Sequence, residues 1–287
     1  MTFNDKANVG GSNARRRGAG YAIAGGGVVG LGAIAVLLLN ILTGGDFSGL
    51  LGGGASTPES SAIENCTTGA QANADDTCRL VASSVVIDQF WAKSVDGYRK
   101  PQLIIVDGST NTPCGTASNQ TGPFYCPSDE TVYIDPTFFG LLRDRFDATA
   151  GSLAQMYVLA HEYGHHIQNI TGVMDDHPNN GTGATSNGVR TELQADCYAG
   201  AWVANAANEK DDNGVAYLKT PTQAQIRDAL NAAASVGDDH IQQEAGVGVN
   251  PETWTHGSSA QRQRWFEAGY DGGVGACDTF AVAGSRL

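Results

Sequence analysis

The stretch "SLAQMYVLAHEYGHHIQNI" (152–170) decides how the second half of this 287-residue chain folds. Its apolar residues recur at helical spacing, as Leu153, Met156 and Leu159 do, which predicts a helix with one buried face. Gly172 stands just beyond it, where glycine commonly ends a helix. The polar residues in the middle of this helix therefore need partners.

That helix carries the pattern H-E-x-x-H at His161, Glu162 and His165. Residues four apart share a face of a helix, so the imidazoles of His161 and His165 can converge on one point, whereas His166 is turned away. Two such imidazoles bind Zn²⁺, and the glutamate can act on a water held by the metal. The alternative is a helix that carries these residues by chance, and a third ligand would decide between the two.

A catalytic zinc takes three protein ligands and leaves a fourth position for water. The pattern H-E-x-x-H-x-x-G-x-x-H is excluded, because Gln168 and Thr171 stand at its last two positions. His177 lies in a polar loop and could reach back, but Glu192 in "ELQAD" is the stronger candidate because it lies on the next predicted helix. Asp196 follows one turn later and is placed to accept a hydrogen bond from a ligand imidazole. The sequence thus predicts one Zn²⁺ per chain, bound by His161, His165 and Glu192.

The order of predicted strands and helices along the chain indicates an α+β protein with few, early strands and a mostly helical second half. The predicted strands are "KPQLIIVDG" (100–108) and "ETVYID" (130–135), the second being either an edge strand that pairs with a substrate or an ordinary core strand. The predicted helices, besides 152–170, are 75–95, 136–146, 188–208, 220–236 and 256–270. Their expected caps include Thr220, with Pro221 at the first helical position, and Ser258 or Ser259.

The N-terminal part has a different composition. No charged residue occurs between Gly18 and Gly45, and "YAIAGGGVVGLGAIAVLLLNIL" (21–42) is long enough to cross a bilayer. The basic residues before it predict a cytoplasmic tail (1–18), a transmembrane helix (19–43), a flexible linker (44–61) and an extracytoplasmic domain (62–287) in the cell envelope. A cleaved signal peptide is the alternative.

The net charge and the cysteine content of the chain limit which partners it can bind and which cysteine sites it can form. The formal net charge of −13 argues against nucleic acid as a partner. None of the six cysteines forms a C-x-x-C pair, so a zinc site made of cysteines is not expected. Exported cysteines in even number predict disulfides. Proximity along the chain favours Cys66–Cys78 and Cys114–Cys126, which leaves Cys197–Cys277 as the third pair.

The blocks "HEYGHHIQN", "ELQADCYAGAW" and "HGSSAQRQRWFEAGYDGG" closely resemble those of the bacterial neutral zinc metallopeptidase family, and the resemblance runs from about Val85 to Cys277. It implies a zincin-like metalloprotease domain of the gluzincin kind. It also implies that His161, His165 and Glu192 bind zinc and that Glu162 is the catalytic acid and base.

The predicted reaction is hydrolysis of peptide bonds in a peptide or protein substrate by a water that zinc activates and Glu162 deprotonates. His256, just before a predicted helix, is the candidate donor to the developing oxyanion, and the alternative is that it caps or packs locally. The alternative function is a catalytically silent envelope scaffold or binding protein with a structural zinc. Nothing in the sequence predicts the oligomeric state.

Overall fold

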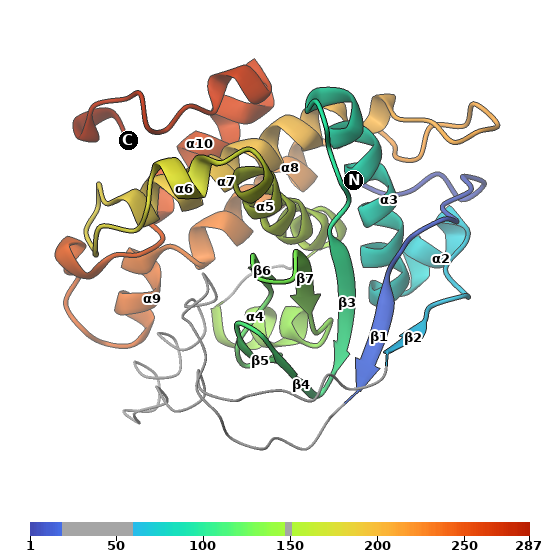
Figure 1. Ribbon diagram of the computed structural model, residues 1–287, viewed down its shortest axis with the longest axis horizontal. Helices are drawn as coiled ribbons and strands as arrows, with labels where there is room; N and C mark the ends of the chain where they lie inside the picture. Colours follow the sequence, from blue (N-terminus) through green and yellow to red (C-terminus); the bar gives the residue numbers. More distant parts are fainter. Residues whose placement is uncertain (19–59, 147–150) are drawn as a thin grey trace.

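The fold is seen in a computed structural model that describes residues 1–18, 60–146 and 151–287. A small sheet lies on one side, and helices gathered around α5 (Ser152–Ile170) make up the other (Figure 1). The predicted α+β class, with a small sheet and a mostly helical second half, agrees with this arrangement.

The main sheet has five strands in the order β2-β1-β3-β7-β6. β1 and β3, and likewise β3 and β7, run parallel, while the edge strands β2 and β6 are antiparallel to their neighbours. The five strands are β1 (Arg15–Gly18), β2 (Ser60–Ala62), β3 (Gln102–Asp107), β6 (Phe124–Cys126) and β7 (Thr131–Ile134). A separate hairpin of β4 (Ser109–Thr112) and β5 (Gly115–Ser118) follows β3. Since β7 lies between β3 and β6, "ETVYID" forms a core strand and β6 is the edge.

Residues 1–18 belong to this domain. Met1, Phe3 and Val9 are fully buried in the main core, and β1 lies between β2 and β3. Two segments that pair in one sheet cannot lie on opposite sides of a membrane, so the predicted cytoplasmic N-terminus with an extracytoplasmic domain is wrong.

The predicted membrane helix (19–43) and most of the predicted linker (44–61) lie outside the described residues. Within the described part of the chain, no helix is both long and apolar enough to cross a membrane. Because β1 and β2, which flank this segment, pair in one sheet, the single-pass anchor expected from the sequence is not supported.

The six helices that the sequence predicts are present, with small shifts at their ends, and the described residues also form three short α-helices that were not predicted. The long ones are α3 (Asp76–Ser94), α5, α7 (Asn187–Asn205) and α10 (Ser259–Gly272). The shorter ones are α2 (Gly69–Ala74), α4 (Phe138–Phe146), α6 (Val173–Asp176), α8 (Gln223–Ser235) and α9 (Asp238–Glu244). Ser258 caps α10 as expected, but Thr222 rather than Thr220 caps α8, because Gln225 completes a capping box with Thr222.

Close helix packing brings α5, α7 and α10 together. A Cβ on Gly164 of α5 would lie 3.0 Å from the Cα of Ala195 on α7. A Cβ on Gly200 would overlap the carbonyl of Phe266 on α10, and one on Gly269 would overlap the carbonyl of Cys197. Only glycine allows these backbones to approach so closely. The helix that bears the H-E-x-x-H pattern is thereby held directly against the helix that bears Glu192.

All three predicted disulfides are present. Cys66 is bonded to Cys78, Cys114 to Cys126, and Cys197 to Cys277. The third joins α7 to the segment that follows α10, across a sequence separation of 80 residues. It fixes the C-terminal segment beside the helix that carries Glu192.

Candidate metal centre

Three side chains converge between α5 and α7. His161 Nε2 lies 3.2 Å from His165 Nε2 and 3.2 Å from Glu192 Oε2, and His165 Nε2 lies 3.5 Å from Glu192 Oε1. All three side chains are buried, and their ligand atoms lie within 4.8 Å of one another. The structure thus brings together the three residues that the sequence proposes as ligands, while their role as ligands stays a prediction.

The hydrogen bonds around the two histidines show which nitrogen faces inward with a lone pair. His161 Nδ1 donates to the Asp196 carboxylate at 2.8 Å, and His165 Nδ1 donates to Gln168 Oε1 at 2.9 Å. In the neutral imidazoles the Nε2 atoms therefore carry lone pairs. Two lone pairs and a carboxylate that face one another in a buried site repel unless a cation lies between them.

The spacing of these atoms suits zinc. Two Zn–N bonds of about 2.0–2.1 Å at a tetrahedral angle would place the nitrogens about 3.3 Å apart. The observed separation of the two Nε2 atoms is 3.2 Å. Among the described residues no fourth histidine, cysteine or carboxylate joins the group. The donor set of two imidazoles and one carboxylate is the kind that a catalytic zinc site uses.

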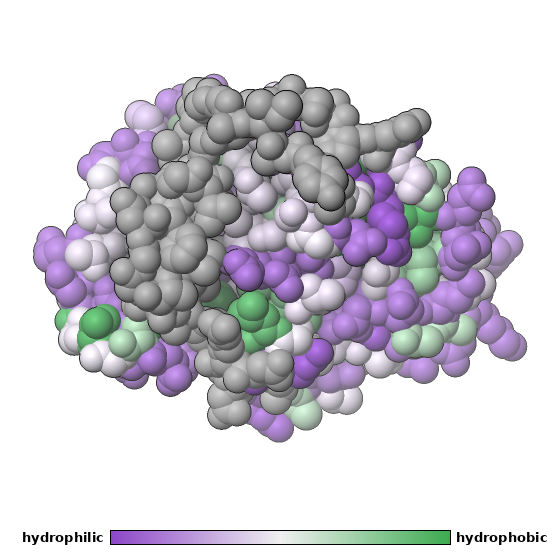
Figure 2. Space-filling view, turned by 90° about the horizontal axis from the view of Figure 1, so that it is seen from below, coloured by the Kyte–Doolittle hydropathy of each residue, from purple (hydrophilic) through white to green (hydrophobic). Residues whose placement is uncertain are grey.

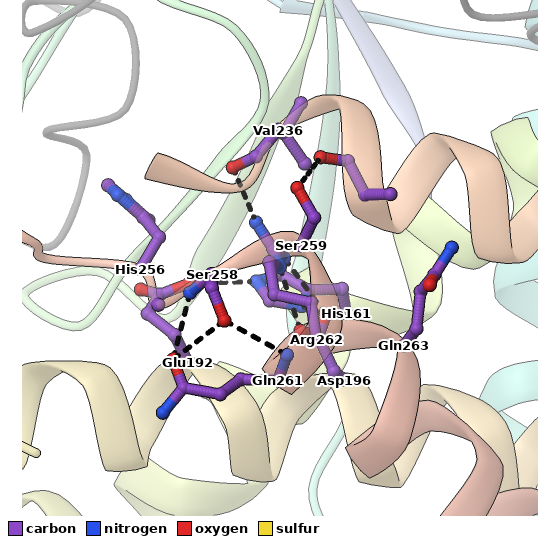
Figure 3. A network of polar contacts seen from close by, with 12 residues as sticks. His161, Glu192, Asp196, Val236, His256, Ser258, Ser259, Gln261, Arg262 and Gln263 are labelled. Atoms are coloured by element: carbon purple, nitrogen blue, oxygen red, sulfur yellow. Dashed lines mark hydrogen bonds and ion pairs between the residues drawn. The ribbon is translucent and has the colours of Figure 1, made fainter. Parts of the chain in front are cut away.

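Asp196 is the centre of a buried polar network on α7 (Figure 3). Besides His161, it accepts hydrogen bonds from Arg262 Nε and Nη2, at 2.8 and 2.9 Å, and from the Tyr157 hydroxyl at 2.5 Å. Burial would raise the pKa of Asp196, but the Arg262 guanidinium and His161 outweigh burial and lower that pKa to about 2. Asp196 therefore stays ionised and fixes the ring of His161.

Burial by itself would lower the pKa of His161, but the carboxylates of Asp196 and Glu192 raise it to about 10 when no cation is bound. The same two negative charges that favour a proton on this imidazole favour a metal ion beside it. A proton and a metal ion would therefore compete for His161.

A second network, which the sequence did not reveal, orients His165. Gln168 Nε2 donates to the carbonyl of Thr191 at 2.7 Å and to Gln194 Oε1 at 3.0 Å, which turns Gln168 Oε1 toward His165. Gln194 in turn donates to the carbonyl of Cys277 at 3.0 Å. The only signal in the sequence was the spacing of Gln168, three residues after His165 on one helix face.

Glu162 is buried next to the ligands, and strand β6 contacts it. Burial raises the pKa of Glu162, while His165, His161 and a hydrogen bond from the backbone of Tyr125 lower it. Tyr125 is itself anchored on α5, since its hydroxyl lies 3.0 Å from His166 Nδ1 and 2.9 Å from Asn169 Nδ2. His166, which cannot reach the metal site, thus holds the edge strand beside Glu162.

The two other candidate histidines lie in different surroundings. His256 is buried, and its Nδ1 lies 2.8 Å from Thr255 Oγ1 and 3.3 Å from Asp238 Oδ1. A charge on His256 would lower the pKa of Glu192, so His256 is electrostatically coupled to the site, but its role as oxyanion donor stays a prediction. His177 stacks on Phe280, with ring centroids 3.9 Å apart, and takes no part in the group of three ligands.

This donor set, on two adjacent helices beside a buried glutamate that is not part of the set, is of the type found in zinc peptidases. The family model described as "Putative neutral zinc metallopeptidase" matches residues 2–280, so the chain belongs to that family.

Relatives from two bacterial species are similar to this chain over most of its length. The uncharacterized protein Rv2575 of Mycobacterium tuberculosis is 49% identical over 223 residues, which cover 77% of this chain and 76% of the relative. The uncharacterized protein YpfJ of Escherichia coli is 37% identical over 262 residues, 85% of each chain. No solved structure matches this chain.

Proposed function

We propose that this chain is a zinc-dependent peptidase that hydrolyses peptide bonds, with Glu162 as the general base and acid. The observation that carries the proposal is the convergence of His161, His165 and Glu192 in a buried site directly beside Glu162. Zinc held by these three residues would lower the pKa of a water at its open position and polarise the scissile carbonyl.

Glu162 would take a proton from the attacking water and deliver it to the leaving amine. Burial raises the pKa of this carboxyl above its ordinary value, which suits a group that must both accept and return a proton. The hydrogen bond from the Tyr125 backbone would hold the carboxylate in place while it does so.

Two features favour an enzyme over a scaffold with a structural zinc. Structural zinc sites are normally closed by four protein ligands, whereas the described residues supply three here. A scaffold would also have no use for a buried glutamate next to the ligands.

Glu162→Gln tests the proposal. The substitution removes the proton acceptor and keeps the shape, so we expect kcat on a fluorogenic peptide library to fall about 10²- to 10⁴-fold. Zinc content by elemental analysis should stay near one ion per chain. The matched control is Glu267→Gln on the exposed side of α10, which should leave both measurements unchanged. A zinc-loaded wild-type protein that cleaves no peptide of the library would instead support the scaffold.

A further inference from the structure

An apolar pocket adjoins the candidate metal centre. His161 and Glu162 form part of its wall, and the pocket contains about 440 Å³ of space, part of it open to solvent. The rest of the wall is mainly apolar and comes from α4, α5 and the end of α8. These side chains are Phe138, Leu142, Val158, Ala232 and Val236.

The polar groups that line the pocket have partners within the protein. Arg262 donates to both Asp196 oxygens and, through Nη1, to the carbonyl of Val236 at 3.1 Å. The Tyr157 hydroxyl is also bonded to Asp196. The charge of Arg262 is thus compensated by Asp196, and a charged side chain seated against the apolar wall would lose its water without gaining a partner there.

In the face shown in Figure 2, hydrophilic side chains predominate and the hydrophobic ones form small separate groups. Among the described residues, the exposed large hydrophobic side chains are Val247 and Val249. The apolar pocket, which is partly open to solvent, shares His161 and Glu162 with the candidate metal centre and suits an apolar group of a ligand.

We propose that the pocket receives one large apolar side chain of the substrate, from a residue that adjoins the cleaved bond. The inference rests on the proposed peptidase function and names its substrate class: peptides with Leu, Ile, Met or Phe beside the cleavage point. Because His161 and Glu162 belong to both the pocket and the candidate metal centre, a side chain seated there brings its own backbone to Glu162. Val236, Ala232 and Val158 would set the size of the side chain that fits.

The test is the cleavage profile of the full-length, zinc-loaded protein on a peptide library, read by mass spectrometry. We expect cleavage next to Leu, Ile, Met or Phe to exceed cleavage next to Ala at least 10-fold in kcat/KM. Val236→Phe fills the pocket, so kcat/KM for these large residues should fall at least 10-fold while the value for Ala falls less. Val247→Phe is the matched control on an exposed position and should leave the profile unchanged.

Val158→Ala gives an independent reading in case Val236→Phe fails to fold. It enlarges the pocket, and the preference should move toward Phe. If the wild type cleaves peptides without any preference and both pocket variants keep its profile, the pocket assignment is overturned and the peptidase stands. If the zinc-loaded wild type cleaves nothing, the proposed function and the pocket assignment fall together.

Discussion

The Nδ1 atoms of His161 and His165 have different hydrogen-bond partners. His161 donates to the Asp196 carboxylate, whereas His165 donates to the neutral Gln168 amide. A carboxylate both orients an imidazole and raises its basicity, while an amide only orients it. The two networks should therefore contribute unequally to zinc affinity.

Asp196→Asn tests this difference. We expect it to weaken zinc binding about 10- to 100-fold, measured by competition with a chromophoric chelator. It should also destabilise the fold, because the buried guanidinium of Arg262 loses its counter-charge. Gln168→Leu, which removes no charge, should weaken zinc binding less. Equal losses in the two variants would contradict the unequal roles.

Asp88 on α3 gives a pH dependence that is independent of the metal site. Burial raises its pKa to about 6, against the opposing hydrogen bond from the Tyr98 hydroxyl at 2.6 Å. This carboxyl is more easily protonated in the folded state. At pH values between the unfolded-state pKa of 3.8 and the folded-state pKa of about 6, the folded protein therefore binds a proton that the unfolded chain does not. Its contribution to stability is therefore lost as the pH rises through that window.

When the pH is lowered from about 7.5 to about 5, the unfolding free energy of the wild type should rise by about 1 kcal/mol relative to that of Asp88→Asn. Urea denaturation of both proteins at each pH measures this. A difference between them that stays constant with pH would show that Asp88 does not titrate in this range.

At the scale of residues, the sequence predicted those parts of the site that depend on local spacing. The i, i+4 relation brings His161 and His165 together, and it also puts Glu192 and Asp196 on one face of α7. Arg262 was missed because its partner, Asp196, lies 66 residues away and only the packing of α10 on α7 brings them together. Tyr125 was missed because its contact with Glu162 is made by its backbone.

At the scale of elements, helices were predictable and strand partners were not. The spacing of apolar residues along the sequence determines the apolar face of α5, whose bounds match the predicted ones. β1 has the sequence "RRRG", without alternation of apolar and polar residues, and its neighbours β2 and β3 begin at residues 60 and 102. Its place in the sheet depends on contacts that no local pattern encodes.

Gly164→Ala tests the contact between α5 and α7. The added methyl group would lie 3.0 Å from the Ala195 Cα and push α7 away, which would move Glu192 from the histidines. We expect weaker zinc binding and a loss of about 1–3 kcal/mol of stability by denaturant unfolding. The matched change, Gly140→Ala on α4, meets no atom closer than 3.7 Å and should stabilise by up to about 1 kcal/mol. Similar effects from the two substitutions would contradict this account of the contact.

At the scale of the whole molecule, the ends of two strands meet where the chain leaves and re-enters the described fold. Arg17 pairs with Ser60 across the antiparallel β1–β2 ladder, so the end of β1 lies beside the start of β2. A turn of about four residues could join them in place of residues 19–59. We expect the shortened protein to fold and to bind one zinc, because β1 and β2 keep their pairing, as measured by urea unfolding and elemental analysis. Loss of zinc binding would show that residues 19–59 support the site.

The position of β1 also determines where the chain can be trimmed for biochemical work. A recombinant product that starts at residue 62, the domain boundary suggested by composition, would lack β1, most of β2 and the buried side chains of Met1 and Phe3. Its β3 would present an unpaired apolar edge, which invites self-association. Such a product would precipitate or resist purification, and an assay on it would say little about the activity of the intact chain.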